Sequence, residues 1–233
     1  MRTLKEVRTT SEKLYVKYEV EEQFRDKVYG GIPKSEEMIV PWLVGRGVPK
    51  PVAEELAVSI SLGIKSKGER QEEVEELEPE VSKAWTGFLS DDEGLYVEAR
   101  QVKASLKEAA NILYRTPAYK RQLLGYRQVI NHGVFVHPDK IRLMKDGEVV
   151  KRPDGWDESP IHVMGPRGER TALKRQDYVR NATIIYQIWV TGGLLSEHLL
   201  KTMLTLNQEQ GRGASRSQGA GTFDVKRFQK LTD

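Results

Sequence analysis

The chain has 233 residues, and 30% of them are charged. It has a formal net charge of +3 at pH 7 and contains no cysteine. Its length suits one large domain or one domain with insertions. The lack of cysteine excludes disulfides and thiolate metal sites and fits a reducing compartment. The first residues lack a signal-peptide pattern, and the longest apolar run is too short to span a bilayer, so we expect a cytoplasmic protein without membrane contact.

Charge is distributed unevenly along the chain. Residues 66–83 carry seven Glu against three Lys or Arg, whereas residues 100–128 carry seven basic residues and one acid. A basic cluster of this kind can bind phosphates, or it can be an ordinary solvated helix face. Charge alone leaves both interpretations open.

The N-terminal part predicts one strand and two helices. Residues 13–22 alternate between apolar and polar, which is typical of a half-buried strand. Residues 24–35 contain a Gly-Gly-x-Pro breaker and predict a loop. Ser35 resembles an N-cap for the first helix, and residues 49–65 predict a second helix that ends at Gly63.

The middle of the chain predicts a hairpin, a helix and a β-rich region. Residues 83–99 contain two strand-like runs around a Ser-Asp-Asp-Glu-Gly turn. Residues 100–115 carry an apolar stripe at helical spacing, with Lys103 and Lys107 on a different face. Residues 133–180 form short strand-like pieces separated by turn signals, with basic residues at the tips.

The C-terminal part predicts strand, helix, glycine-rich loop and strand. Residues 182–190 predict a core strand, and residues 196–210 a helix with Ser196 as its N-cap. The glycine-rich loop, residues 211–221, reads GRGASRSQGAG. It is followed by the alternating run TFDVKRF, whose apolar residues must be buried, so the loop is not a tail.

Glycines allow positive φ angles and let a backbone approach a ligand, while arginines in the same loop supply charge for an anion. A Walker loop needs a Gly-Lys-Ser/Thr sequence that opens a helix, and a dinucleotide fingerprint also precedes a helix. The glycine-rich loop instead follows a helix and precedes a strand, which excludes both motifs. A flexible connector with a glycine C-cap remains an alternative.

The pattern of Gly-x-Gly, five residues including Arg, and Gly-x-Gly between the last helix and the last strand resembles the RAMP superfamily. These are RNA-associated proteins of CRISPR effector complexes and of guide-RNA processing. That family usually has hydrophobic residues at the intervening positions, to which Ala220 conforms and Arg212 does not. The stretch YVEARQVKASLKEAANIL also resembles a strand–turn–helix of backbone-type members, although it lacks their proline and glycine.

The resemblance implies an α+β fold with a ferredoxin-like (RRM-like) core sheet and helices on one face. It implies one RAMP-like domain over residues 1–233, with a helical and acidic insertion at 25–83 and a β-rich, thumb-like insertion at 133–180. We expect the final strand to pair with residues 13–22 or 182–190. The RNA-binding residues that we expect are Lys103, Ser105, Lys107, Gly211, Arg212, Gly213, Ser215, Arg216, Ser217, Gly219 and Gly221.

The sequence offers two weak catalytic candidates. RAMP nucleases that process RNA use a histidine near the first helix, but no histidine precedes His132. Effector subunits that cleave RNA carry an aspartate after the first strand, where Asp26 lies here; a surface ion pair with Arg25 or Lys27 is the alternative. The four histidines show no metal-ligand spacing, and we expect neither metal nor cofactor.

We therefore expect a non-catalytic subunit that binds single-stranded guide RNA through its backbone. Its other partners would be related subunits, or copies of itself, in a CRISPR-type ribonucleoprotein complex. One alternative is an endoribonuclease with the same fold. A second is a viral or mobile-element structural protein that uses this fold for assembly.

Overall fold

The computed structural model describes residues 14–34, 36–45, 47–65, 85–165, 168–192 and 194–232, with the backbone alone at 36–38, 59–65, 161–165 and 168–172. The acidic stretch 66–83 and the expected helix cap Ser35 lie outside the described residues.

The core follows the order strand, helix, strand, strand, helix, strand. These elements are β1 (Tyr15–Phe24), α6 (Ala99–Tyr114), β7 (Val134–His137), β13 (Thr183–Thr191), α9 (Glu197–Gln210) and β14 (Phe223–Lys230). The four strands form one antiparallel sheet in the spatial order β14, β1, β13, β7. This is the βαββαβ arrangement of the ferredoxin-like fold. The expected α+β, ferredoxin-like core is confirmed, as is the pairing of the final strand with the first.

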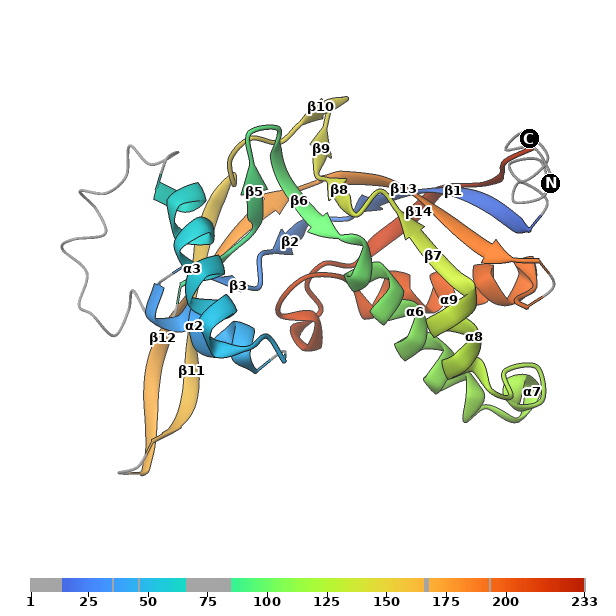
Figure 1. Cartoon of the computed structure of the whole chain (residues 1–233), viewed down its shortest axis with the longest axis horizontal. Helices are drawn as coiled ribbons and strands as arrows, with labels where there is room; N and C mark the ends of the chain where they lie inside the picture. Colours follow the sequence, from blue (N-terminus) through green and yellow to red (C-terminus); the bar gives the residue numbers. More distant parts are fainter. Residues whose placement is uncertain are drawn as a thin grey trace, which may run out of the picture.

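Period-two alternation directs one face of this sheet into the core. Tyr18, Val20 and Phe24 of β1 are buried, and every second residue of β13 is buried in the same way. Helices α6 and α9 pack on that face and against each other, as expected (Figure 1). Leu106 of α6 and Met203 of α9 are almost fully buried there. Ser196 caps α9 as predicted, because its Oγ accepts a hydrogen bond from the Leu199 amide at 3.3 Å.

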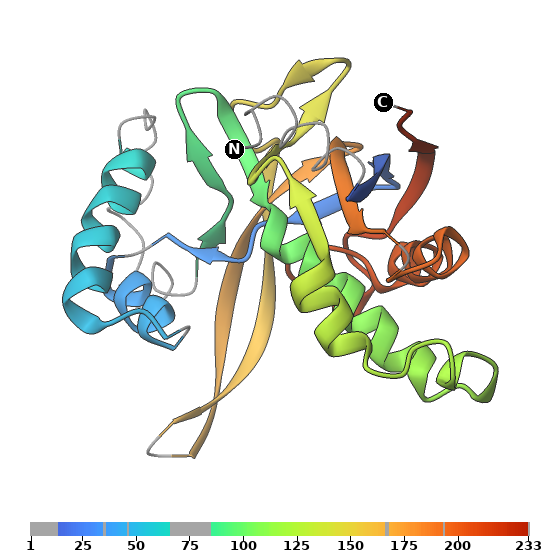
Figure 2. The same cartoon turned by 45° about the vertical axis from the view of Figure 1, so that its right-hand side comes forward.

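Two insertions extend this core. The first contains β2 (Lys27–Tyr29), β3 (Ile32–Pro33), α2 (Glu36–Val44), α3 (Lys50–Lys65), β4 (Thr86–Gly87), β5 (Leu89–Asp91) and β6 (Gly94–Glu98). The second, expected at 133–180, is interrupted by the core strand β7. Before β7 lie α7 (Pro117–Lys120) and α8 (Tyr126–Gly133); after it lie β8 (Lys140–Arg142), β9 (Met144–Lys145), β10 (Glu148–Val149), β11 (Gly155–Gly165) and β12 (Gly168–Arg180). Helices α2 and α3 pack around a small core of their own, which contains Ile39 and Ala53. Strands β11 and β12 form a long hairpin that extends away from the ferredoxin-like core (Figure 2).

Two expectations about the first insertion are wrong. Residues 24–35 are not all loop, because β2 pairs with β12 and places Val28 opposite Val179 in the buried core. Strands of two or three residues are too short for alternation to reveal them. The second helix passes Gly63 and ends at Lys65, since one glycine weakens a helix without having to end it.

The predicted turn at residues 91–94 is confirmed. Asp91 accepts hydrogen bonds from the Glu93 and Gly94 amides and from the side chains of Arg142 and Lys140. The hydrogen bond from Arg142 is the largest of the effects that hold the pKa of Asp91 well below its usual range. In the part of the chain that the structure describes, no helix has the length and apolarity needed to cross a membrane.

Candidate nucleic-acid interface

All four glycines of the glycine-rich loop adopt the left-handed conformation, with φ of 72° at Gly211, 79° at Gly213, 81° at Gly219 and 70° at Gly221. A side chain at three of them would meet the chain's own backbone. An added Cβ would lie 2.4 Å from Ala220 O at Gly211, 2.4 Å from Tyr29 O at Gly213, and 1.9 Å from Arg212 O at Gly221. At Gly219 nothing lies within 4 Å. Close approach within the protein therefore explains three glycines, and only Gly219 leaves room for a ligand.

The loop is fixed to the fold by its backbone. The Ala214 amide donates to Tyr29 O at 2.9 Å, and the Gly221 amide donates to Lys27 O at 3.0 Å, so both halves of the loop are hydrogen-bonded to the edge of β2. At its base, the Arg212 amide donates to Gly221 O at 2.9 Å. These bonds give the loop one defined path, unlike that of a flexible connector.

Arg212 is the main departure from expectation. Its side chain is only 6% exposed and forms an ion pair with Glu22, which is completely buried. The guanidinium also donates to Ser105 Oγ at 2.7 Å and to the Tyr186 hydroxyl at 3.2 Å, and lies 4.9 Å from the ring centre of Phe223. Burial is the largest single effect and would lower the pKa of Arg212, but the charges and hydrogen bonds of Glu22 and Tyr186 together outweigh it, and the pKa is raised. We refer to this set of side chains as the Arg212 network.

Arg212 and Ser105, both expected to contact RNA, instead have buried side chains that bond within the protein. Ser105 is also buried, and its Oγ donates to Val102 O at 2.8 Å and accepts from Asn207 Nδ2 at 3.3 Å. Both side chains face the interior because a carboxylate of β1 lies there to pair with the arginine. Burial and the negative charge of Glu22 raise the pKa of Tyr186, which donates its hydroxyl proton to that carboxylate.

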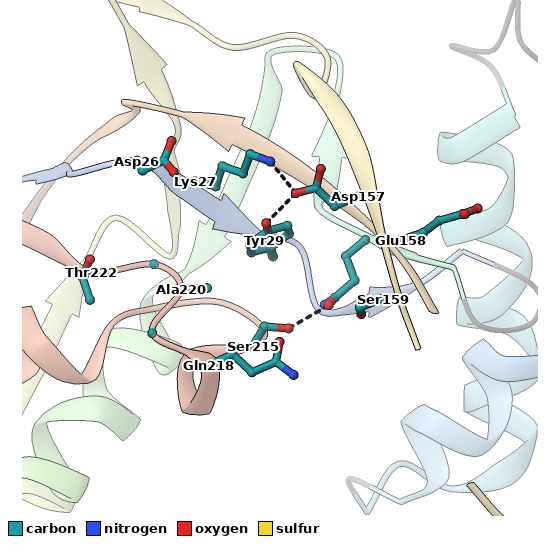
Figure 3. A pocket seen from close by; sticks show the side chains of 13 residues that line it. Asp26, Lys27, Tyr29, Asp157, Glu158, Ser159, Ser215, Gln218, Ala220 and Thr222 are labelled. Atoms are coloured by element: carbon teal, nitrogen blue, oxygen red, sulfur yellow. Dashed lines mark hydrogen bonds and ion pairs between the residues drawn. The ribbon is translucent and has the colours of Figure 1, made fainter. Parts of the chain in front are cut away.

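The outer side of the loop lines an open groove of about 460 Å³, which we call the groove (Figure 3). One wall is the second half of the loop, and the other is β2 together with the base of β11. The lining residues are Asp26, Lys27, Tyr29, Asp157, Glu158, Ser159, Gln176, Ser215, Gln218, Gly219, Ala220, Gly221 and Thr222. The groove thus brings together the expected residues Asp26, Ser215, Gly219 and Gly221.

The charged groups of the groove already have partners, either within the groove or in Arg175 and Arg180 of β12. Lys27 Nζ bonds Asp157 Oδ2, which also accepts from the Tyr29 hydroxyl at 2.6 Å. Burial would raise the pKa of Asp157, but the bonds from Lys27 and Tyr29 outweigh it and lower the pKa. Burial, reinforced by Asp157, raises the pKa of Tyr29. Asp26 is 74% exposed and lies 3.8 Å from Arg180 Nε.

Comparison with known proteins adds one likeness. No protein-family model matches the chain, and no curated protein matches its sequence. Among solved structures, it is similar to a chain in the cryo-EM structure of the Type III-B Cmr-beta bound to cognate target RNA, with 10% identity and a TM-score of 0.48. The match covers 97% of this chain and 66% of the other, so this chain spans less than two thirds of its neighbour's length. A likeness at this level assigns neither a family nor a function.

The remaining expected residues lie away from the groove lining. Arg216 forms an ion pair with Glu108 of α6 at 2.9 Å, and Ser217 is exposed beside it in the turn Arg216–Gln218. Lys103 and Lys107 both donate to Asn131 at the end of α8, at 2.9 and 3.0 Å. Burial lowers the pKa of Lys103, and the charge of Lys107 adds to this effect.

His132 lies in the last turn of α8 and is exposed there. Helix α8 packs against α6 and β7, so His132 shares no surface with Asp26 in the groove. Among the described residues, no three His, Asp or Glu side chains are placed to hold a metal ion.

Sequence reasoning missed the contribution of the hairpin. Lys174, Gln176, Tyr178 and Arg180 alternate along β12 and therefore share one face. Gln176 of this row accepts a hydrogen bond from Ser215 Oγ at 2.7 Å, which joins the hairpin to the loop. The alternation KRQDYVR could have indicated a polar strand face, but nothing in the sequence relates that face to a loop about forty residues later.

Proposed function

We propose that this chain is a non-catalytic, RNA-binding subunit of a CRISPR-type ribonucleoprotein effector complex. It would hold single-stranded guide RNA by contacts to its backbone, beside related subunits or copies of itself. The observation that supports this most directly is the position of the glycine-rich loop. It forms one wall of an open groove beside a ferredoxin-like sheet, facing the long β11–β12 hairpin.

The two ends of the loop suggest different roles in holding RNA. The first Gly-x-Gly is anchored in the core by the Arg212 network, which leaves Arg216 as the cation of the loop nearest the surface. An exposed ion pair such as Arg216–Glu108 contributes about 0–1 kcal/mol in water. A phosphate can therefore displace Glu108 from Arg216 at small cost.

Purification provides the first test. The protein isolated from its native complex should show an absorbance ratio at 260 and 280 nm typical of bound nucleic acid, and the extracted strand should be RNA of defined length. A nucleic-acid-free particle would instead favour the structural-protein alternative. Failure of the nucleic-acid-free protein to bind any added single strand would overturn the proposal.

Salt dependence provides the second test. Arg216→Ala should weaken binding similarly for unrelated RNA sequences. It should make the slope of log affinity against log salt shallower by about 0.7, the value for one lost phosphate contact to a single strand. Arg100→Ala is the matched control, because Arg100 is also an exposed arginine of an ion pair, with Glu98 at 2.5 Å. Equal slopes for both variants would remove Arg216 from the interface.

An endoribonuclease is the second candidate, and the position of Asp26 favours it. Asp26 is highly exposed, lines the groove and, within the described residues, forms its ion pair with Arg180 at 3.8 Å. On the non-catalytic proposal, Asp26→Ala leaves RNA binding and any associated cleavage unchanged, as does the exposed turn variant Asp92→Ala. Loss of a metal-dependent cut in Asp26→Ala alone, with RNA affinity intact, would establish the nuclease.

A further inference from the structure

The floor of the groove holds a polar pair that the proposed function does not use. Gln176 is only 4% exposed, and its Nε2 has no hydrogen-bond partner among the described residues. A buried donor without a hydrogen-bond partner destabilises the folded state, because it has lost its bonds to water. Native proteins seldom leave such a group unsatisfied, so the Gln176 amide indicates an acceptor supplied from outside the chain.

Ser215 completes the pair. Its hydroxyl donates to Gln176 Oε1 at 2.7 Å, so the lone pairs of its Oγ remain available to the groove (Figure 3). Ser215 has a φ of 57°, in the left-handed region that non-glycine residues seldom adopt. Strained residues of this kind gather at ligand sites, where the surrounding structure holds them in place. The glycine-rich loop thus presents an acceptor directly beside the unpaired donor of Gln176.

The charge of the groove argues against a phosphate at this position. Three of its lining residues are carboxylates, and each already pairs with a cation: Asp26 with Arg180, Asp157 with Lys27 and Glu158 with Arg175, so a phosphate would have to displace a carboxylate from its partner. The residue opposite Gln176 on β11 is the carboxylate Asp157, and the neutral residues Ser159 and Gln218 also line the groove. A neutral ligand group that both donates and accepts a hydrogen bond suits this environment better than an anion does.

We propose that Gln176 and Ser215 bind a ribose 2′-hydroxyl and thereby select RNA over DNA. The 2′-hydroxyl would donate to Ser215 Oγ and accept from Gln176 Nε2, which matches the donor and acceptor character of that group. A deoxyribose offers neither bond and leaves the Gln176 amide unsatisfied. The inference rests on the proposed RNA-binding function and adds to it the chemical group that the groove recognises.

The experiment compares three single strands of the same length that differ only at the 2′ position: uridine, deoxyuridine and 2′-fluoro-deoxyuridine. The fluorinated strand keeps the sugar pucker of RNA but has no 2′ donor. Fluorescence anisotropy should show that the wild-type protein binds the uridine strand about fivefold to tenfold more tightly than either other strand, as expected for about 1 kcal/mol of net hydrogen bonding. This comparison requires no variant to fold.

Two variants then assign the preference to residues. Gln176→Leu and Ser215→Ala should each bind the uridine strand as weakly as the deoxyuridine strand. Their affinity for the deoxyuridine strand should equal that of the wild type. The matched controls are Gln128→Leu, at an exposed position of α8, and Thr205→Ala, which removes an exposed hydroxyl of α9 outside the groove lining. Both controls should keep the wild-type preference.

Each other outcome overturns the inference. If the fluorinated strand binds like uridine, the protein selects sugar pucker rather than the hydroxyl. If Gln176→Leu keeps the preference for the uridine strand, or lowers the affinity for the uridine and deoxyuridine strands equally, then Gln176 and Ser215 only stabilise the conformation of the loop. Equal wild-type affinity for uridine and deoxyuridine refutes ribose selection and leaves the RNA-binding proposal intact. No affinity for any strand refutes the proposed function itself.

Discussion

Replacing Arg212 by methionine separates a structural arginine from an RNA-binding one. The substitution keeps much of the side-chain volume but removes the positive charge beside Glu22. Glu22 is fully buried, and its other polar partner is the Tyr186 hydroxyl. The variant therefore retains a buried carboxylate with no cation in contact.

The expected loss of stability is large. Removing one member of a buried ion pair costs about 3–5 kcal/mol, because the remaining charge is left uncompensated. The free energy of unfolding of a domain is typically only about 5–15 kcal/mol, so Arg212→Met should remove a large share of it. Arg216→Ala in the same loop breaks an exposed pair and should cost about 0–1 kcal/mol.

Urea denaturation followed by circular dichroism measures both variants against the wild type. A double variant, Glu22→Gln with Arg212→Met, should be more stable than Arg212→Met alone because no buried charge remains; the Tyr186 hydroxyl keeps an acceptor in the glutamine amide. The structural account fails if the free energy of unfolding of Arg212→Met lies within about 1 kcal/mol of the wild-type value while the variant loses RNA affinity. Arg212 would then be an RNA-binding residue.

Three further outcomes follow from local geometry. Gly213→Ala should destabilise the protein far more than Gly219→Ala, since only at Gly213 would the new Cβ meet backbone, 2.4 Å from Tyr29 O; equal denaturation midpoints would contradict this. Asp91→Asn should lower the free energy of unfolding by about 1–2 kcal/mol at pH 7. Because the folded-state pKa of Asp91 is lowered, the difference in unfolding free energy between variant and wild type should shrink as pH falls below about 4. A difference that stays constant with pH would refute the ion-pair account. Ser196→Ala should cost about 1 kcal/mol through loss of the α9 cap, measured by thermal unfolding, and an unchanged Tm would show that the cap contributes nothing.

The core was predictable because its elements are long and strongly periodic. The burial of β1 alternates from Tyr18 to Phe24, and α6 places an apolar residue on one face at every turn. Such patterns follow from burial of one face and need no knowledge of distant residues. The short strands β2 and β3 carry too few residues for any period to appear.

The side chains of the interface were less predictable, because their roles depend on partners far away in sequence. From the sequence alone, Arg212 is expected to be a surface cation in a polar loop. Its contact with Glu22 of β1 is formed only by the fold. Lys103 and Lys107 were correctly placed on a face other than the apolar stripe, but that face meets α8 rather than the loop. Helical spacing determines which residues share a face, not which neighbour covers that face.

The glycine-rich loop carries two physical demands within one motif. Gly211, Gly213 and Gly221 are required by the chain itself, since a Cβ at any of them would strike its own backbone. A resemblance based on these glycines therefore reports the local fold of the loop before it reports any ligand. The other residues of the motif can contact a ligand. Ser215 and Gly219 face the groove, and Arg216 lies on the side of α6. An RNA strand in the groove would consequently meet hydroxyl, amide and open backbone on one side of the loop, and would reach Arg216 on the other side by displacing Glu108.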